Sequence, residues 1–210
     1  MRVTEIFHSI QGETSRAGLP CWFVRFTGCD LRCGYCDTAY AFHGGEDLER
    51  PEILERLRAH PTRFVTLTGG EPLLQRELPE LSAELLAQGY LVAVETHGQR
   101  SVARLPREVI KIVDVKTPDS GEVARDWSIF GELDPKDELK FVLCSRADFD
   151  WALRIIHEHR LEDRFPILFS PSHGQLDPQA LVAWVLESGV RVRLNLQLHK
   201  LIWGADARGV

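Results

Sequence analysis

The chain has 210 residues, and its 44% hydrophobic and 27% charged residues are typical of one globular domain spanning residues 1–210. Its net charge of −6 argues against a protein that binds nucleic acid directly, since such proteins carry a basic face. No apolar run approaches the ~20 residues needed to cross a bilayer, and the first residues lack the pattern of a secretion signal, so the sequence predicts a cytoplasmic protein with no membrane role.

Short apolar runs alternate with stretches of helical spacing along the chain. Strands are expected over Cys21–Thr27, Phe64–Thr68, Leu91–Thr96, Val109–Val115, Glu138–Cys144, Pro166–Ser170 and Val190–Leu198. Helices are expected over Pro51–Ala59, Leu73–Gln88, Asp148–Arg160 and Asp177–Glu187. This alternation is typical of α/β proteins with a parallel sheet. Because a closed eight-unit barrel takes about 250 residues, we expect a partial, incomplete parallel β/α barrel.

Polar, glycine-punctuated segments follow most of these strands. They include Gly28-Cys29, Gly69-Gly70-Glu71-Pro72, His97-Gly98, Lys116-Thr117-Pro118, Ser170–Gly174 and His199-Lys200. In parallel α/β folds, ligands bind at the carboxyl ends of the strands. The sequence therefore predicts one site at this edge of the sheet.

Three cysteines lie close together in this pattern. Cys29, Cys33 and Cys36 have the spacing C-x3-C-x2-C, and no fourth cysteine follows nearby. Electron-transfer clusters use four cysteines, and structural zinc sites have four ligands. Three thiolates therefore favour a 4Fe-4S cluster with one iron open to an exchangeable ligand. Cys21 and Cys144 lie alone in apolar runs, so a disulfide framework is not expected.

Two other uses of these cysteines stay open on the residues alone. A Cys3His zinc-binding module would take His43 as its fourth ligand. A redox pair would use Cys33 and Cys36 at the start of a helix. Neither explains Thr68–Pro72, where two glycines allow the backbone to approach a ligand closely. Taken alone, that segment is equally typical of a turn that begins a helix with proline.

A cysteine loop with an aromatic residue before its last cysteine, followed by Gly-Gly-Glu-Pro, resembles the radical S-adenosylmethionine (SAM) superfamily. Three further segments resemble the 7-carboxy-7-deazaguanine synthase family within it. They are the opening Ile6–Glu13, the cluster-loop ending Cys36–Thr38 and the closing Leu196–Lys200. The opening segment is what singles out this family, and the resemblance covers essentially the whole chain.

The resemblance implies a lyase that contracts the ring of 6-carboxy-5,6,7,8-tetrahydropterin to 7-carboxy-7-deazaguanine with loss of ammonia. The product would feed 7-deazapurines such as queuosine. SAM would bind the open iron, yield a 5′-deoxyadenosyl radical on one-electron reduction, and be regenerated. The resemblance also implies Mg²⁺, a reductant such as flavodoxin and a homodimer.

The resemblance assigns roles to particular residues. Cys29, Cys33 and Cys36 would hold the cluster, and Thr38 would help bind Mg²⁺, which prefers oxygen ligands. On the residues alone, Thr38 is equally typical of a helix N-cap. SAM would contact Tyr35, Asp37, Gly70, Glu71, Glu95, Lys116, Ser170, Pro171, Ser172 and His173. The substrate would contact Ile10, Gln11, Gly12, Glu13, Arg25 and Thr68.

The expected substrate contacts follow from functional-group chemistry. The Arg25 guanidinium matches a carboxylate in two hydrogen bonds, although a strand arginine more often faces solvent. Gln11 and Glu13 would pair with the guanidine-like edge of the pterin. His97 stands where the family pattern has asparagine, and the tail Trp203–Val210 matches no recognised pattern.

Two rival functions differ in what they require. A glycyl-radical-enzyme activating enzyme would share the cysteine loop and Gly-Gly-Glu-Pro but has no need of Gln11–Glu13 with Arg25. A Cys3His zinc-binding module of a nucleic-acid-processing complex would be expected to show a basic patch, which the acidic balance argues against.

Overall fold

A nine-stranded sheet forms the centre of the molecule in the computed structural model, which describes residues 1–210. The strands are β1 (Arg2–Ile10), β2 (Pro20–Phe26), β3 (Glu46–Asp47), β4 (Phe64–Gly69), β5 (Leu91–Thr96), β6 (Ile110–Asp114), β7 (Glu138–Leu143), β8 (Ile167–Pro171) and β9 (Arg193–Leu194). The α-helices are α1 (Arg50–Leu57), α2 (Leu78–Ala87), α3 (Arg146–Glu158), α4 (Pro178–Ser188) and α5 (Leu198–Trp203). The 3-10 helices are η1 (Ala39–Phe42), η2 (Pro72–Leu74), η3 (Pro118–Ser120), η4 (Ser128–Gly131) and η5 (Leu161–Asp163).

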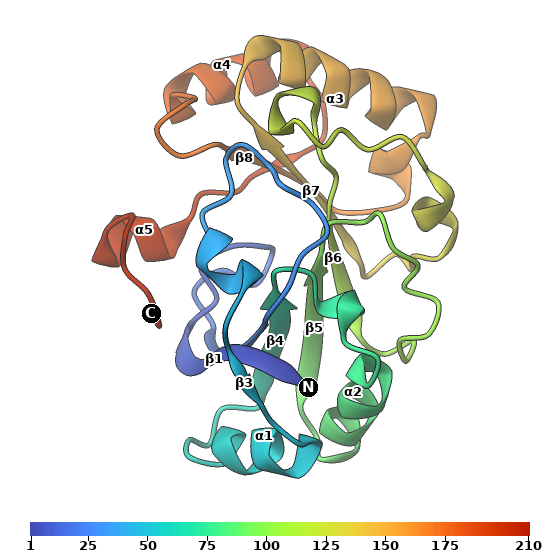
Figure 1. The fold of residues 1–210 in the computed structure, drawn as a ribbon. Coiled ribbons are helices and arrows are strands. Elements are labelled where there is room, and N and C mark those ends of the chain that lie inside the picture. The colour runs from blue at the N-terminus through green and yellow to red at the C-terminus, as the bar shows by residue number, and fades with distance from the viewer.

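The strands follow the order β3-β1-β2-β4-β5-β6-β7-β8-β9 across the sheet. Every neighbouring pair from β2 to β9 is parallel, whereas β1 is antiparallel to both β2 and β3. The edge strands β3 and β9 do not pair with each other, so the barrel stays open. The prediction of a partial parallel β/α barrel is confirmed (Figure 1). No helix has the length and apolar character that crossing a bilayer would need.

Local sequence signals explain where the longer helices begin and end. The Ser145 side chain accepts a hydrogen bond from the Asp148 amide at the start of α3. Asp177 does the same for the Gln179 amide at the start of α4, with a distance of 3.0 Å. Gly189 has a φ of +66° and ends α4, because this left-handed conformation is accessible to glycine without strain. These interactions determine where α3 and α4, which pack on the outside of the sheet, begin and end.

The two faces of the sheet carry different side chains. On the outer face, the Phe169 ring packs edge to face against Phe141 of β7 at 5.7 Å and against Phe149 of α3 at 5.6 Å, and all three side chains are fully buried. The inner face carries a smaller apolar cluster of Cys21, Phe23, Phe64, Ala93, Ile110 and Ile112. Because strand side chains alternate between faces, residues two positions further along point the same way. Those residues are Arg25, Thr66, Glu95 and Asp114. The inner face thus changes from apolar to polar toward the carboxyl ends of the strands.

The two ends of the chain differ from the prediction. Local sequence patterns predict no strand before Cys21, yet β1 pairs along β2 with Phe7 opposite Phe23. The strand expected over Val190–Leu198 shrinks to β9, and Leu198 begins α5 instead. The Leu198 amide donates to the Gly12 carbonyl at 2.9 Å, which turns the chain away from the sheet edge. Both differences depend on long-range pairing that local apolar patterns do not reveal.

The single helix expected over Leu73–Gln88 is interrupted. The structure has η2, then a break, and then α2 starting at Leu78. Pro79 lies in the first turn of α2, where its missing N–H is tolerated. The same proline further inside a helix would remove a hydrogen bond and clash with the preceding turn, so the helix begins here.

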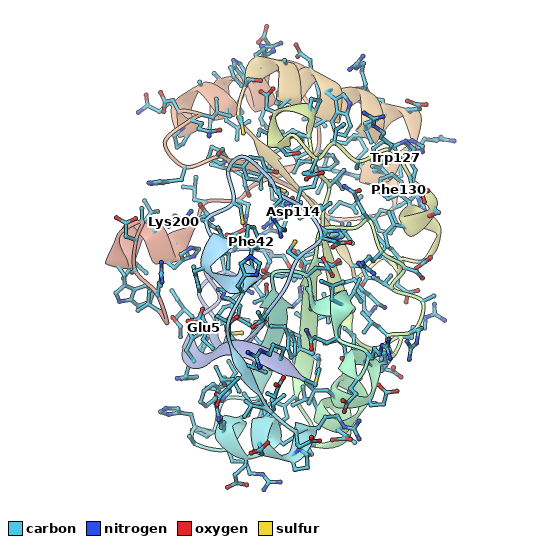
Figure 2. All side chains as sticks on the ribbon, in the orientation of Figure 1. Glu5, Phe42, Asp114, Trp127, Phe130 and Lys200 are labelled. Atoms are coloured by element: carbon cyan, nitrogen blue, oxygen red, sulfur yellow. The ribbon has the colours of Figure 1, made fainter.

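Trp127, Phe130 and Trp151 form an aromatic cluster on the outside of the barrel. The rings of Trp127 and Phe130 stack with centroids 5.4 Å apart, and Trp151 of α3 lies 6.0 Å from Trp127. Phe130 is buried, and the two tryptophans pack against the main core. Figure 2 shows Trp127 and Phe130 together, on the opposite side of the molecule from Lys200. These aromatic residues therefore contribute to the core.

Candidate active site

A cavity of about 550 Å³ lies at the carboxyl ends of the strands, a size suited to small-molecule ligands. Polar residues of the inner face line it together with the cysteine loop and the C-terminal segment 205–210. Every predicted site residue lines this cavity except Glu71. The structure thus brings residues from both ends of the sequence to one place.

Glu71 differs from the prediction because its carboxylate points into the protein. It is fully buried and accepts hydrogen bonds from the Leu73 amide, the Thr96 hydroxyl and the His97 amide at 2.9 to 3.0 Å. These bonds join the segment after β4 to the end of β5. Glu71 therefore positions the site and does not present its carboxylate to a ligand.

The cysteine loop has a defined backbone. The Gly28 amide donates to the Ala41 carbonyl at 2.8 Å, and the Gly34 amide donates to the Ser120 carbonyl at 2.9 Å. Gly28 has a φ of +100°, in the region that favours glycine. These bonds hold a loop whose cysteines Cys29, Cys33 and Cys36 are all free and partly buried.

The distances between the three cysteine sulfurs indicate whether the loop suits a single zinc ion or an iron–sulfur cluster. Zinc–sulfur bonds of about 2.3 Å require thiolates on one ion to lie within about 4.6 Å of one another. The sulfurs of Cys29, Cys33 and Cys36 do not all lie within 4.8 Å of one another. Three separated thiolates fit a multi-iron cluster, in which each sulfur binds a different metal atom. Burial raises the pKa of Cys29 and Cys33 and thereby disfavours their thiolate forms. A bound metal centre, with its positive charge, would favour the thiolates again.

His43 does not join the cysteines. It is exposed, and the three ligating side chains that do lie close together are Cys29, Asp30 and His97. His97 Nε2 lies 3.0 Å from Asp30 Oδ1, while Arg100 donates to Asp30 Oδ2 at 2.8 Å. The geometry therefore argues against the Cys3His alternative. His97, which departs from the family pattern, instead joins the end of β5 to the cysteine loop.

Gly70 lies where the backbone after β4 meets the cysteine loop. A Cβ on Gly70 would stand 1.8 Å from the Gly28 carbonyl oxygen, and the Glu71 amide donates to that same oxygen at 2.7 Å. Gly70→Ala is therefore expected to lower the free energy of unfolding by about 2 kcal/mol or more, because backbone atoms must move.

Chemical denaturation of the metal-free protein measures this change. Gly131→Ala is the matched control, since Gly131 has open space around its Cβ position and no left-handed φ. Equal stability of Gly70→Ala and Gly131→Ala would contradict the steric argument.

Arg25 lies in the cavity wall and not on a solvent face. Its side chain is 17% exposed, and its Nε donates to Glu5 Oε1 at 2.7 Å. Tyr40 donates to the same oxygen at 2.8 Å, and the guanidinium carbon lies about 6 Å from the rings of Phe7 and Tyr40. Because only Nε has a protein acceptor, the other guanidinium N–H groups are available to a ligand.

Gln11 and Glu13 have different tasks. Gln11 is buried, and its amide donates to Thr66 and Glu95 at 3.1 and 3.2 Å while accepting from the Glu13 backbone amide. Gln11 therefore holds the backbone from which Glu13 projects. Burial raises the pKa of Glu95, and the Gln11 amide and Thr68 hydroxyl donate to its carboxyl group.

Glu13 is held as a carboxylate. It accepts hydrogen bonds from Lys140 Nζ at 3.0 Å and from Gln197 Nε2 at 2.8 Å. Burial by itself would raise the pKa of Glu13, but the Lys140 ammonium and these hydrogen bonds hold it below its usual value. A charged acceptor therefore faces the cavity.

Several cavity residues were not predicted from the sequence, among them Lys140, Asp114 and Tyr40. The signal for the first two was present: Lys140 lies within the apolar run of β7, and Asp114 follows Val113 at the end of β6. A charged residue in a buried strand is rare unless it is paired. Lys140 and Asp114 are such a pair, with Nζ and Oδ2 3.6 Å apart.

The C-terminal segment closes one side of the cavity. Lys200, which Figure 2 labels beside α5, donates to Asp37 Oδ2 at 2.7 Å. Its side chain is only 9% exposed. Burial opposes ionisation of Asp37, yet the Lys200 charge keeps the pKa of Asp37 well below its usual range. Beyond α5, the Arg208 guanidinium lies 4.3 Å from the centre of the Tyr40 ring. Residues 205–210 thus reach the cavity, which local patterns in the tail did not indicate.

Comparisons with known proteins agree with this arrangement. The radical SAM superfamily profile matches residues 23–117. A 7-carboxy-7-deazaguanine synthase from Koribacter versatilis is 45% identical over 100% of both chains, and one from Chlorobaculum tepidum is 42% identical over 100% of this chain and 97% of its own. The crystal structure of QueE from Escherichia coli shares the fold with a TM-score of 0.78 at 21% identity, covering 93% of each chain. The chain therefore belongs to the 7-carboxy-7-deazaguanine synthase family of the radical SAM superfamily.

Proposed function

We propose that this protein is a lyase that converts 6-carboxy-5,6,7,8-tetrahydropterin to 7-carboxy-7-deazaguanine and ammonia. The observation that carries the proposal is that one cavity holds Cys29, Cys33 and Cys36 together with Arg25 and Glu13. The first three suit a cluster, and the last two suit a substrate with a carboxylate and a guanidine-like edge. The similarity to 7-carboxy-7-deazaguanine synthases over the full chain supports the same product.

The cluster and SAM would be bound by the cysteine loop and the adjacent strand ends. Cys29, Cys33 and Cys36 would hold the 4Fe-4S cluster. When bound, the cluster and SAM supply one-electron reduction and reversible hydrogen-atom abstraction. SAM would contact Tyr35, Asp37, Gly70, Glu95, Lys116, Ser170, Pro171, Ser172 and His173, all of which line the cavity.

The substrate would be held by the opposite wall. Arg25 would donate from its free N–H groups to the carboxylate, and Glu13 would accept from the pterin N–H groups. Ile10, Gly12 and Thr68 would complete the contacts. The rings of Phe7 and Phe23 stack at 4.9 Å in the same wall and help to exclude water. Arg25 at one end of the pterin and Glu13 at the other would hold its ring in a fixed orientation during the rearrangement.

Further components follow from the family resemblance and from the residues present. Thr38 would help bind Mg²⁺, because its hydroxyl lies 2.9 Å from Asp37 Oδ1 and Mg²⁺ prefers oxygen ligands of this kind. A reductant such as flavodoxin would supply the electron. A cytoplasmic location would keep the three crowded cysteines reduced. Residues 1–210 would act as one domain, consistent with a single sheet, and two copies would form a homodimer.

One anaerobic experiment tests the reaction. The protein is reconstituted with iron and sulfide and mixed with reductant, SAM, Mg²⁺ and 6-carboxy-5,6,7,8-tetrahydropterin, and products are identified by mass spectrometry. We expect 7-carboxy-7-deazaguanine with SAM regenerated. Stoichiometric zinc without iron would overturn the radical chemistry. Accumulation of 5′-deoxyadenosine with unchanged pterin would overturn the substrate alone.

A further inference from the structure

Lys140 is a largely buried lysine that lines the cavity. It lies on β7 with a side chain 12% exposed, and its Nζ is 3.0 Å from Glu13 Oε2 and 3.6 Å from Asp114 Oδ2. An ammonium group has three N–H donors and no acceptor. Two of them face these carboxylates, so one donor has no protein acceptor. This remaining N–H donor is available to a ligand bound in the cavity, because Lys140 lines the cavity.

Lys140 and Glu13 are both charged in this setting. Burial by itself would lower the pKa of Lys140, but the carboxylates of Glu13, Asp114 and Glu95 raise it well above its usual value. The wall therefore presents an anionic acceptor beside a cationic donor. Each Glu13 oxygen accepts one protein hydrogen bond and keeps room for a second.

The cavity has two other lysines, Lys116 and Lys200, and Lys200 is paired with Asp37 at 2.7 Å. Lys116 has a different position. The Lys116 Nζ lies 3.0 Å from Asp114 Oδ2 and 5.4 Å from the centre of the Tyr35 ring, next to the cysteine loop. Lys140 is the lysine that bonds to Glu13. Of the three cavity lysines, Lys140 is therefore the one placed beside the Glu13 carboxylate.

The chemistry of the pairing identifies the group that it fits. The pyrimidine edge of a pterin presents two neighbouring N–H donors followed by a carbonyl acceptor. Its complement is two acceptors followed by a donor, which is the order offered by the Glu13 carboxylate and the adjacent Lys140 ammonium. We propose that Lys140 is a specificity-determining residue that donates to the C4 carbonyl of the pterin while Glu13 accepts from the two N–H groups. This assignment rests on the proposed function and adds a residue that selects the 2-amino-4-oxo edge.

The first test changes the ligand and keeps the protein. Holoenzyme reconstituted anaerobically with cluster and SAM is titrated with pterin-6-carboxylate and with its 4-thioxo analogue, which keeps both N–H donors but has a weaker acceptor at position 4. We expect the thioxo analogue to bind about tenfold to hundredfold more weakly, as for the loss of a charge-assisted hydrogen bond. Equal affinity would overturn the proposed contact.

The second test removes the donor. In Lys140→Met, the preference for oxygen over sulfur is expected to disappear. In the matched control Lys111→Met, which removes a buried, paired strand lysine outside the cavity, the preference should stay. A merely structural role for Lys140 would weaken both ligands equally and leave their ratio unchanged.

The outcomes distinguish an error in the proposed substrate from an error in the proposed Lys140 contact. Wild-type holoenzyme that binds neither pterin-6-carboxylate nor 6-carboxy-5,6,7,8-tetrahydropterin would refute the proposed substrate. Binding by wild type with an unchanged oxygen preference in Lys140→Met would refute the role of Lys140 alone. If Lys140→Met fails to fold, Lys140→Gln is measured in its place. Because glutamine removes the charge, the oxygen preference should then fall partway, and an unchanged preference again refutes the role.

Discussion

Replacing Cys33 by alanine is expected to prevent assembly of the iron–sulfur cluster and to reduce turnover to an undetectable level. With Cys29 and Cys36 alone, the loop offers two thiolates, and a cubane cluster held by two ligands is not retained. Because Cys33 is only partly buried and makes no side-chain hydrogen bond in the structure, the fold itself should tolerate alanine. We therefore expect loss of the cluster and of turnover, with little change in the free energy of unfolding.

Iron and sulfide content after anaerobic reconstitution, together with visible absorbance, measures the cluster. Cys144→Ala is the control, because Cys144 is also free and partly buried but does not line the cavity. It should retain iron and turnover. Full iron content in Cys33→Ala would show that the loop does not hold the cluster as proposed.

Replacing Arg25 by alanine is expected to spare the cluster and to lower kcat/KM for the pterin by roughly 100-fold to 10,000-fold. The range corresponds to about 3–6 kcal/mol for two charge-assisted hydrogen bonds to the substrate carboxylate. Arg25→Lys keeps the charge but not the planar fork and should fall between alanine and wild type. Steady-state kinetics with a parallel measurement of iron content checks both variants.

The control for Arg25 accounts for the ion pair that it forms. Arg2→Ala also removes a strand arginine with a carboxylate partner, Asp47, but this pair is exposed and lies outside the cavity. Arg2→Ala should leave kcat/KM unchanged. Removing Arg25 leaves Glu5 with the Tyr40 hydroxyl as a donor, so the protein is expected to fold. Unchanged turnover in Arg25→Ala would mean that the carboxylate binds elsewhere.

Much of the fold and site was predictable from local patterns. The parallel strands were expected because apolar β-branched runs alternate with helical spacing, and β7 and β8 start and end within a residue of the predicted ranges. The cavity was expected at the carboxyl ends of the strands for the same reason. The spacing of Cys29, Cys33 and Cys36 identified the cluster loop without any tertiary information.

Other features depended on contacts between distant segments. The sequence placed Glu71 beside a ligand, but three hydrogen bonds from η2 and the end of β5 turn its carboxylate inward. In the sequence, Lys140 is only a charged residue within an apolar strand. Its place in the site depends on the contact with Glu13, which is 127 residues away in the chain.

The amino-acid sequence by itself determined which chemistry this protein carries, since the cysteine spacing, Gly-Gly-Glu-Pro and the opening Ile6–Glu13 are local patterns. It also determined which strand residues share a face, because side chains alternate along every strand. The tertiary structure alone decided which of those residues meet. Pairing of β1 with β2 and docking of α5 on Asp37 bring both chain ends to the cavity. The physical reason is that burial and ion pairing are set by neighbours in space, which local periodicity does not encode.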